Sequence, residues 1–297
     1  MQTWNAELLY KTELILGEGP HWHPGWKKFL YVDIEGRKVG RIDPVTKITE
    51  ERATGKRVGT VVPANDHRLI IALEDAIEEL DFETGARKEL MKIEADKPGN
   101  RSNDGKCDAA GRLWVGTMSM NEELKQGALY CFDGSLQQKL SDISISNGIC
   151  WSRDNRTMYF IDSLDYHIKA YDFEVSTGNI SNERIIVEVK EPGHTPDGMT
   201  IDQEGMLWVA MWGGACIHRY DPASGKLIGK VEVPAPYVTA CAFGGENMQT
   251  LFITTARIGL SKDQLQQYPL SGSLFYININ IKGSEMNRFI LKENSGS

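Results

Sequence analysis

The fold of this 297-residue chain is indicated by the stretch Arg112-Leu113-Trp114-Val115-Gly116. The stretch is short, apolar and rich in aromatic and β-branched residues, as expected of a buried strand. Related stretches recur along the chain and align on Leu30, Leu69, Leu113, Met158, Leu207 and Leu251. The intervals between these positions are 39, 44, 45, 49 and 44 residues. A period in the forties that occurs six times predicts a β-propeller.

Each repeat has the same internal order. A tight turn rich in Asp, Asn and Gly precedes the apolar stretch, and a second strand follows it. We therefore expect an all-β fold of six four-stranded antiparallel blades around a central channel. Residues 1–291 are expected to form this single domain, followed by a polar tail at residues 292–297. We expect Leu8-Leu9-Tyr10 and Leu14-Ile15-Leu16 to complete the last blade beside Phe289-Ile290-Leu291, and residues 261–268 to form a short helical turn.

Composition and charge limit the classes of partner. The formal net charge is −8, which argues against nucleic acid and anionic membranes. No apolar run approaches the roughly 18 residues needed to span a bilayer, and the first residues lack the basic and apolar regions of a signal peptide. A cytoplasmic location is therefore expected. The five cysteines are odd in number and form no Cys-x-x-Cys pair, so neither a disulfide framework nor a structural zinc site is expected.

Three glycine-containing phrases stand at matching points of the repeat: Gly17-Glu18-Gly19-Pro20, Ser146-Asn147-Gly148 and Pro196-Asp197-Gly198. The innermost strands of a propeller all run the same way along the axis, so their first residues open at the same end. We therefore expect Glu18, Asn147 and Asp197 to meet at one mouth of the channel. Their oxygen atoms would suit a hard cation. The alternative is that these phrases are ordinary turn signals, in which glycine only relieves the backbone.

These phrases, together with two further motifs, resemble the regucalcin/gluconolactonase family of sugar-lactone lactonases, also called senescence marker protein-like. The motifs are Leu16-Gly17-Glu18-Gly19-Pro20-His21-Trp22, Arg101-Ser102-Asn103-Asp104-Gly105-Lys106, Gly116-Thr117-Met118, Ser146-Asn147-Gly148 and Pro196-Asp197-Gly198-Met199. The resemblance extends over nearly the whole chain. It implies a six-bladed propeller with one divalent metal ion over the channel. It also implies that the metal ligands are Glu18, Asn147 and Asp197, and that Arg101 and Asn103 bind the substrate.

The chain departs from the family pattern in one loop. Many members have an acidic residue that contacts the substrate after the motif at residues 116–118. Here the loop reads Ser119-Met120-Asn121-Glu122-Glu123. Asn121 takes the acidic position and is our candidate for substrate binding, with Glu122 beside it as the alternative. The preference among sugars therefore depends on this loop.

The resemblance implies metal-dependent hydrolysis of a small sugar lactone by a monomer or weak homodimer. Two carboxylates and one amide favour Ca²⁺, with Zn²⁺, Mg²⁺ and Mn²⁺ as alternatives. The metal would polarise the ester carbonyl and activate water, and Asp197 is the candidate general base. Two other functions stay open. One is hydrolysis of a different ester, lactone or organophosphate on the same metal, and the other is a calcium- or ligand-binding propeller without turnover.

Several other polar and aromatic side chains are interpreted as structural. His21 and His23 are expected to pack on a strand face and in a turn. His194 is expected on a loop surface, although it lies only three residues before Asp197. Trp212 is expected to pack between blades, with stacking against a sugar as the alternative.

Overall fold

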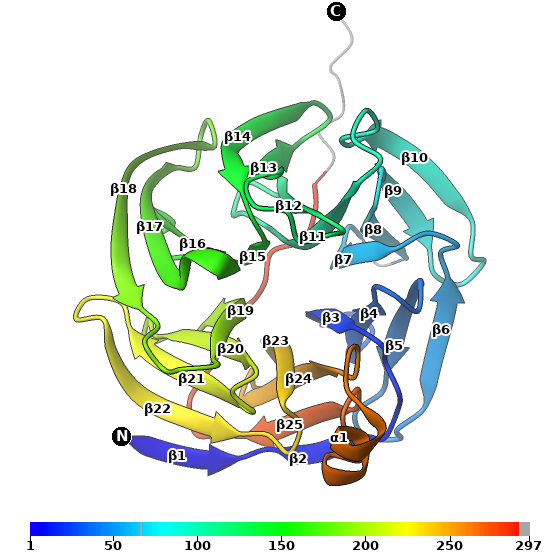
Figure 1. Cartoon of the computed structure of the whole chain (residues 1–297). Helices are drawn as coiled ribbons and strands as arrows, with labels where there is room; N and C mark the ends of the chain where they lie inside the picture. Colours follow the sequence, from blue (N-terminus) through cyan, green and yellow to red (C-terminus); the bar gives the residue numbers. More distant parts are fainter. Residues whose placement is uncertain (66, 291–297) are drawn as a thin grey trace, which may run out of the picture.

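The computed structural model describes residues 1–65 and 67–290 and consists mainly of β-strands (Figure 1). The predicted polar tail at residues 292–297 lies outside the described residues. The strands are gathered into groups that surround a central axis, as in a propeller. The prediction of an all-β, propeller-like fold is therefore confirmed.

Four of the sheets have four strands each, and every strand pairs antiparallel with the next one in sequence. The first contains β3 (Gly17–His23), β4 (Lys28–Asp33), β5 (Lys38–Ile42) and β6 (Thr49–Ala53). The second contains β7 (Val58–Pro63), β8 (Arg68–Leu73), β9 (Ala76–Asp81) and β10 (Arg87–Lys92). The third contains β11 (Asn100–Cys107), β12 (Leu113–Ser119), β13 (Gly127–Phe132) and β14 (Leu136–Ile143). The fourth contains β15 (Ser146–Trp151), β16 (Thr157–Asp162), β17 (His167–Glu174) and β18 (Asn179–Glu188).

A nine-stranded sheet contains the other described strands. Its members are β19 (Thr195–Ile201), β20 (Leu207–Trp212), β21 (Cys216–Asp221), β22 (Lys226–Glu232), β23 (Tyr237–Gly244), β24 (Thr250–Ala256), β25 (Leu274–Asn278), β1 (Gln2–Asn5) and β2 (Glu7–Tyr10). A single residue pair, Trp212 with Tyr237, links β20 to β23. Because this sheet is continuous, the strand pairing does not confirm the predicted number of six blades.

The N-terminal segment closes the ring of sheets. β2 pairs antiparallel with β25, as predicted, and β1 adds a parallel pairing with β22 that the sequence did not indicate. The predicted position of Phe289 and Ile290 beside these N-terminal strands is wrong, and Leu291 lies outside the described residues. Their backbone amides instead donate to the carbonyl oxygens of Pro63 and Gly111, across the ring (Figure 1). Burial explains the difference, because the ring of Phe289 stacks on Phe132 at 5.6 Å.

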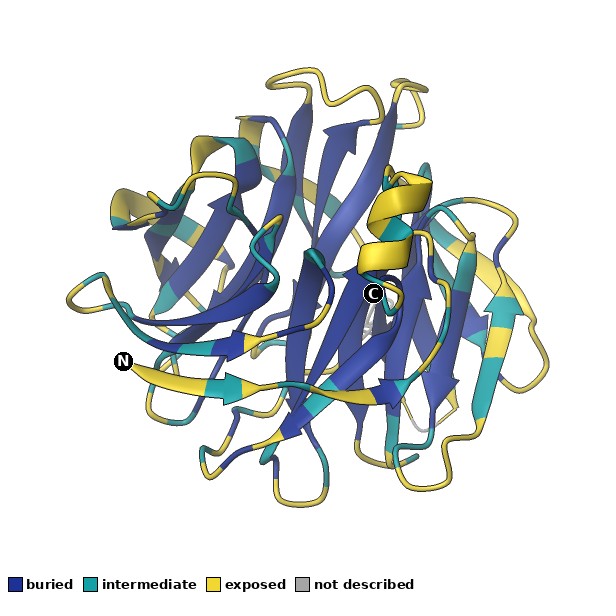
Figure 2. Cartoon of the chain, turned by 60° about the horizontal axis from the view of Figure 1, so that its bottom comes forward, coloured by how far each residue is buried: buried dark blue, intermediate teal, exposed yellow. Residues whose placement is uncertain are grey.

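The strands nearest the axis are the most deeply buried. They are β3, β7, β11, β15, β19 and β23, each of which contacts the next, while β23 contacts β3. Outer strands such as β10 and β18 are largely exposed (Figure 2). Apolar side chains, including the fully buried Trp114, Trp208 and Phe252, fill the space around these inner strands. The inner strands are thus held rigidly on both sides, which suits them to position a site.

Helical structure is limited to α1 (Lys262–Gln267) and the 3-10 turn η1 (Ser163–Asp165) within the described chain. Ser261 begins α1 with a capping box, in which its side chain accepts from the Gln264 amide and the Gln264 side chain accepts from the Ser261 amide. This confirms the predicted helical turn. Neither helix of the described residues has the length and apolar character needed to cross a membrane.

Candidate metal and substrate site

Four of the six candidate site residues lie in or next to β-bulges of the inner strands. Each inner strand pairs regularly with its neighbour except at one interruption. In the four inner strands that carry candidate site residues, the interruptions fall between Glu18 and His21, between Ser102 and Gly105, between Ser146 and Ile149, and between Pro196 and Met199. A bulge leaves residues outside the ladder and redirects their side chains. Asn103, Asn147 and Asp197 lie inside these interruptions, and Glu18 borders the first.

The glycines next to these residues allow the inner strands to approach one another. A Cβ atom at Gly148 would lie 2.7 Å from the carbonyl oxygen of Asp197. A Cβ atom at Gly198 would lie 2.4 Å from the Cβ atom of Ala240 on the next inner strand. Gly19 has a φ of 56°, in the left-handed region that glycine adopts without strain. Glycine in each phrase therefore permits either the close approach of two strands or a positive φ. The polar residue beside it supplies the side chain that lines the pocket.

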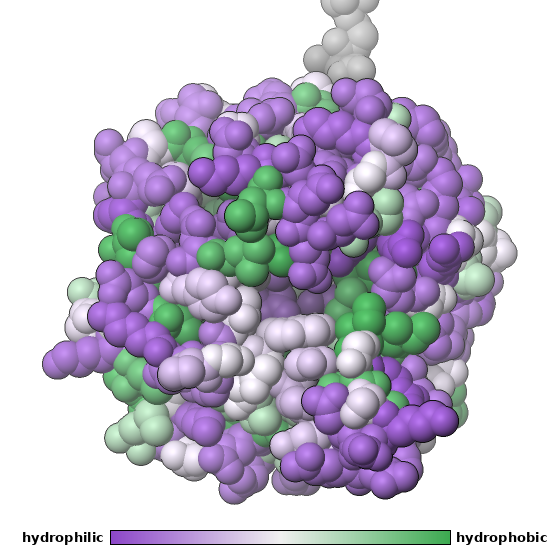
Figure 3. Space-filling view, in the orientation of Figure 1, coloured by the Kyte–Doolittle hydropathy of each residue, from purple (hydrophilic) through white to green (hydrophobic). Residues whose placement is uncertain are grey.

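One pocket of about 440 Å³ brings five of the six candidate site residues together: Glu18, Arg101, Asn103, Asn147 and Asp197. All five are buried. Asn121 is exposed and is not among the described lining residues, whereas its neighbour Glu122 lines the pocket. The role of Asn121 stays a prediction. The face seen in Figure 3 has a hollow near its centre, with polar and apolar side chains around it.

A chain of hydrogen bonds fixes the amides of the pocket. Nη1 of Arg101 donates to Oδ1 of Asn103 at 2.6 Å. Nδ2 of Asn103 donates to Oδ1 of Asn147 at 3.1 Å, and Nδ2 of Asn147 donates to Oγ of Ser163 at 2.8 Å. The Ser163 hydroxyl in turn donates to the carbonyl oxygen of Pro196 at 2.7 Å. This network connects β11, β15 and β19 and sets the orientation of Asn147.

The acidic side chains of the site repel one another in a buried environment. Burial, followed by the charge of Asp104, raises the pKa of Glu18 to about 8. Burial, followed by the charges of Glu18 and Asp104, raises the pKa of Asp197 well above its usual range. Oδ1 of Asp197 is buried without a hydrogen-bond partner. A hard divalent cation would neutralise this charge and fill the open position, so the residues present fit such an ion.

The wall of the pocket combines arginine side chains, among them the buried Arg101, with an aromatic stack. Burial lowers the pKa of Arg101, while the charges of Glu35 and Glu18 act in the opposite direction. Trp212 and Tyr237 lie parallel, with ring centroids 4.1 Å apart, at the junction between β20 and β23. Both rings line the pocket. Trp212 thus packs at the predicted type of junction and also faces the space where a substrate would lie.

The histidines near the predicted ligands do not line this pocket. His21 is buried, and burial lowers its pKa to about 3. His23 stacks on Trp26 with ring centroids 4.1 Å apart. His194 faces His218, with centroids 5.6 Å apart. The next residue, Thr195, lines the pocket, whereas His194 does not.

Comparison with known proteins assigns the chain to a family. Residues 16–257 match the family described as SMP-30/Gluconolactonase/LRE-like region. The chain belongs to this family. Regucalcin of Danio rerio is 37% identical over 288 residues, which cover 95% of this chain and 97% of that protein. A Bacillus subtilis (strain 168) protein, provisionally named sugar lactone lactonase YvrE, is 36% identical over 281 residues, covering 94% and 96%.

A solved structure extends this SMP-30/gluconolactonase assignment to the fold. The calcium-binding protein regucalcin from Agrobacterium tumefaciens strain C58 superposes with a TM-score of 0.94 at 29% identity, covering 98% of this chain and all of that one. The family match at residues 16–257 includes all six candidate site residues. It leaves out β1, β2 and the C-terminal segment that crosses the ring.

Sequence reasoning missed Ser163, the residue that orients Asn147 in this SMP-30/gluconolactonase chain. A signal was available in the residue before it. Asp162, at the end of β16, accepts hydrogen bonds from the amides of Ser144 and Ile145 just before β15. Asp33, at the end of β4, accepts in the same way from the amides before β3. This repeated aspartate marks where the chain turns into the pocket.

Proposed function

We propose that this chain hydrolyses small sugar lactones in a metal-dependent reaction at the pocket of Glu18, Asn147 and Asp197. The observation that carries the proposal is the convergence of these three residues beside the hydrogen-bonded pair Arg101 and Asn103. An oxygen-rich ligand set next to side chains that bind hydroxyl groups suits ester hydrolysis in a sugar ring. Membership of the family described as SMP-30/Gluconolactonase/LRE-like region, and similarity to a protein provisionally named sugar lactone lactonase, support the same activity.

Glu18, Asn147 and Asp197 would hold the metal ion. Ca²⁺ is the preferred ion, with Zn²⁺, Mg²⁺ and Mn²⁺ as alternatives. When bound, this ion supplies a Lewis acid that polarises the lactone carbonyl. Ser163 orients Asn147 by accepting a hydrogen bond from Nδ2, and Oδ1, which accepts one hydrogen bond from Asn103, keeps a second lone pair for the metal ion. Asp197 retains an oxygen without a hydrogen-bond partner.

Asp197 is the proposed general base. The water oxygen attacks the carbonyl carbon, and Asp197 accepts the proton that the water loses. The bond between the carbonyl carbon and the ring oxygen then breaks, and the ring oxygen takes that proton to become a hydroxyl group. The products are the open-chain acid and a regenerated Asp197 carboxylate.

Arg101 and Asn103 are proposed to hold the sugar. Arg101 presents a fixed fork of donors, and its contact with Asn103 keeps both side chains in one orientation. Trp212 and Tyr237 give the pocket a flat apolar wall that excludes water from one side of the ring. At the loop after β12, Glu122 is favoured over Asn121 as the substrate contact because it lines the pocket.

We further propose that residues 1–291 form one six-bladed domain. In this interpretation the nine-stranded sheet contains two blades, β19–β22 and β23–β25 with β2, which share only the pair Trp212–Tyr237. All residues given a role belong to one chain, so a monomer or a weak homodimer in the cytoplasm would suffice. The proposed partner is the sugar lactone alone, without nucleic acid or membrane.

The test is a metal-exchange assay on gluconolactone. Protein stripped with a chelator is given Ca²⁺, Mg²⁺, Mn²⁺ or Zn²⁺, and acid release is compared with spontaneous hydrolysis. We expect a rate that depends on the metal and survives in Asp165→Asn, which removes an exposed carboxylate from η1. If no metal produced a rate above the spontaneous one with any five- or six-membered sugar lactone, the proposal would be wrong.

Calcium binding without turnover is the second candidate function. It is favoured by the regucalcin of A. tumefaciens, which is described as a calcium-binding protein. This function predicts that Asp197→Ala weakens Ca²⁺ binding. It also predicts that the unaltered protein hydrolyses no lactone faster than the spontaneous rate. Calorimetric titration of Ca²⁺ beside the lactone assay separates the two functions.

A further inference from the structure

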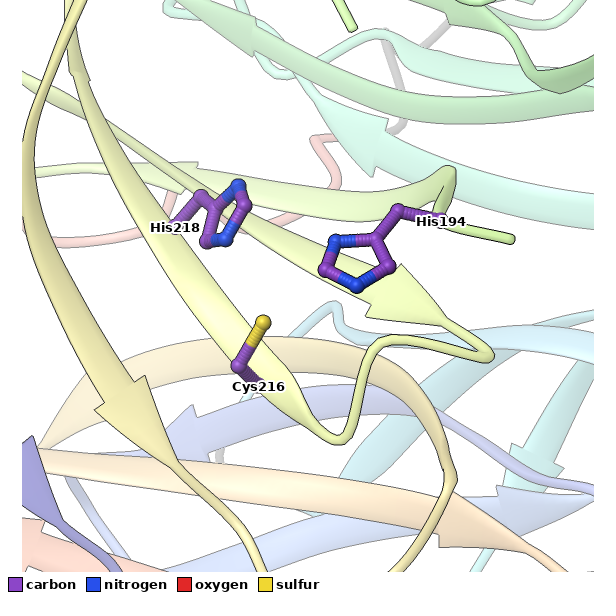
Figure 4. Close-up of side chains that lie close together, drawn as sticks. All are labelled: His194, Cys216 and His218. Atoms are coloured by element: carbon purple, nitrogen blue, oxygen red, sulfur yellow. The ribbon is translucent and has the colours of Figure 1, made fainter. Parts of the chain in front are cut away.

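A cluster of side chains of metal-ligating types lies in the β19–β22 part of the nine-stranded sheet. His194, Cys216 and His218 each offer one ligand atom, and these atoms all lie within 4.8 Å of one another. Cys216 and His218 are two residues apart on β21, so they point to the same face of the strand. His194 reaches them from the segment just before β19 (Figure 4). None of the three lines the pocket of Glu18 and Asp197.

The surroundings leave these side chains available to a metal ion. Nδ1 of His218 is hydrogen-bonded to the hydroxyl group of Tyr220 at 3.0 Å. With Nδ1 as the donor, Nε2 keeps its lone pair, which is the usual arrangement when a second residue orients a metal-binding histidine. Nδ1 of His194 is buried without a hydrogen-bond partner. Gly214 makes room for this ring, since a Cβ there would lie 3.1 Å from Cγ and Nδ1 of His194.

We infer that His194, Cys216 and His218 form a binding site for a thiophilic divalent metal ion of the Zn²⁺ class. One thiolate and two imidazoles are a donor set that Zn²⁺ accepts in tetrahedral sites, whereas Ca²⁺ and Mg²⁺ prefer oxygen. Tetrahedral Zn–N and Zn–S bonds are about 2.0 to 2.3 Å long. Ligand atoms within 4.8 Å of one another need only small side-chain rotations to reach that geometry.

The protonation states agree with this assignment. Burial lowers the pKa of His218 to about 4, so this imidazole is neutral near pH 7 and loses no proton on binding. Burial raises the pKa of Cys216 to about 12, so the thiol gives up its proton only when a metal replaces it. Three protein ligands leave the fourth tetrahedral position to a water molecule.

The site would connect two segments that matter to the pocket. His194 directly precedes β19 and lies three residues before Asp197 on that strand, while Cys216 and His218 belong to β21. A bound ion would fix the loop before β19 against β21. The inferred role is therefore structural, and it is independent of the lactonase proposal.

Cobalt titration tests the inference directly, because Co²⁺ replaces Zn²⁺ and a thiolate ligand gives it an intense charge-transfer absorption. The full-length protein is stripped with a chelator, and excess Ca²⁺ is added to occupy the oxygen site. We expect one equivalent of Co²⁺ to produce the thiolate absorption and Zn²⁺ to remove it by competition. Cys216→Ser should abolish the absorption, and His194→Gln should weaken Co²⁺ binding at least about tenfold.

Two matched variants control for general damage. Cys241→Ser alters another fully buried cysteine, and His167→Gln alters another partly exposed histidine, so both should keep the absorption. If Cys216→Ser failed to fold, His194→Gln would decide, since its side chain is only partly buried. The inference is overturned if no thiolate absorption develops, or if it persists unchanged in folded Cys216→Ser or in His194→Gln.

Discussion

The oxygen-rich pocket and the His194/Cys216/His218 cluster differ in how the chain assembles them. Glu18, Asn147 and Asp197 come from three different inner strands and lie in or next to bulges at corresponding points of the repeat. The histidine and cysteine ligands come from one group of strands, at positions that the repeat does not relate. The first site is a product of the ring as a whole, whereas the second is local to one part of it.

The two sites also differ in charge and in donor chemistry. The pocket holds carboxyl groups whose pKa values are raised by burial and mutual repulsion, so an ion there relieves an unfavourable charge. The cluster holds a neutral imidazole and a protonated thiol, so an ion there must displace a proton from sulfur. With both sites filled as proposed, one fold would separate a hard cation from a thiophilic one by donor type alone.

Replacing Asp197 should abolish the activity of the pocket and leave metal binding at the His194/Cys216/His218 cluster unchanged. Asp197→Ala removes both a proposed metal ligand and the proposed general base, so we expect kcat on gluconolactone to fall at least about 10³-fold. Folding should survive, because the change removes a buried carboxyl group that is repelled by Glu18 and Asp104. The thiolate absorption with Co²⁺ should be retained. Loss of that absorption would show that the two sites are not independent.

Replacing Arg101 should weaken substrate binding in the pocket. Lysine keeps the charge of Arg101 but loses the fork that donates to Asn103 and to the Ser102 carbonyl oxygen. We expect Arg101→Lys to lower kcat/KM about 10- to 100-fold, mainly through a higher KM. Arg57→Lys is a suitable control, because Arg57 also lines the pocket but is paired with Glu35, and a change of less than about threefold is expected. Equal effects of the two substitutions would contradict the role of Arg101.

Calcium should stabilise the protein more at high pH than at low pH. In the metal-free fold the pKa of Glu18 is raised to about 8 from 4.5, so the folded state holds a proton that the unfolded state loses between these values. The metal-free protein therefore loses stability from this group as the pH rises through that range. Below pH 8 Ca²⁺ must displace the proton, so its affinity should be about 10- to 100-fold lower at pH 6 than at pH 8.

Thermal denaturation and calorimetry check this pH dependence. The increase in Tm caused by a fixed Ca²⁺ concentration should be larger at pH 8 than at pH 6, and binding at pH 6 should release protons to the buffer. A Ca²⁺ effect that is the same at both pH values would show that Glu18 is not a ligand. Glu123→Gln, which alters an exposed acidic residue, should leave the pH dependence unchanged.

The fold and most of the pocket could be predicted because they follow from the repeat. Residues at one phase of a ring-shaped repeat must meet, which is why the sequence alone predicts that Glu18, Asn147 and Asp197 lie together. The bulges themselves were not predicted, although the glycines at positions 148 and 198 mark them. Glycine at a bulge and glycine at a simple turn look the same in sequence.

Features that break the repeat could not be predicted in the same way. The pairing of β1 with β22 and the path of residues 289–290 depend on which apolar surface is left uncovered once the ring has closed. The approach of His194 to Cys216 depends on the missing Cβ of Gly214 in a turn, a contact between strands that are not adjacent. The spacing of Cys216 and His218 on one strand was the only local signal of that cluster.

The smallest expected effect concerns the loop after β12, where Asn121 and Glu122 compete for one role. The backbone amide of Glu122 donates to the Ser119 carbonyl oxygen, and Glu122 has a φ of 55°; its charge acts on Arg101. The amide of Asn121 donates to the Ser119 hydroxyl group, and its side chain is exposed.

We expect Glu122→Gln to lower kcat/KM about 3- to 10-fold for a lactone that carries hydroxyl groups, and Asn121→Ala to change it less than about twofold. The difference should vanish for a lactone without hydroxyl groups, because only a sugar can use the carboxylate as an acceptor. A larger effect of Asn121→Ala than of Glu122→Gln would show that Asn121 contacts the substrate and that Glu122 only borders the pocket.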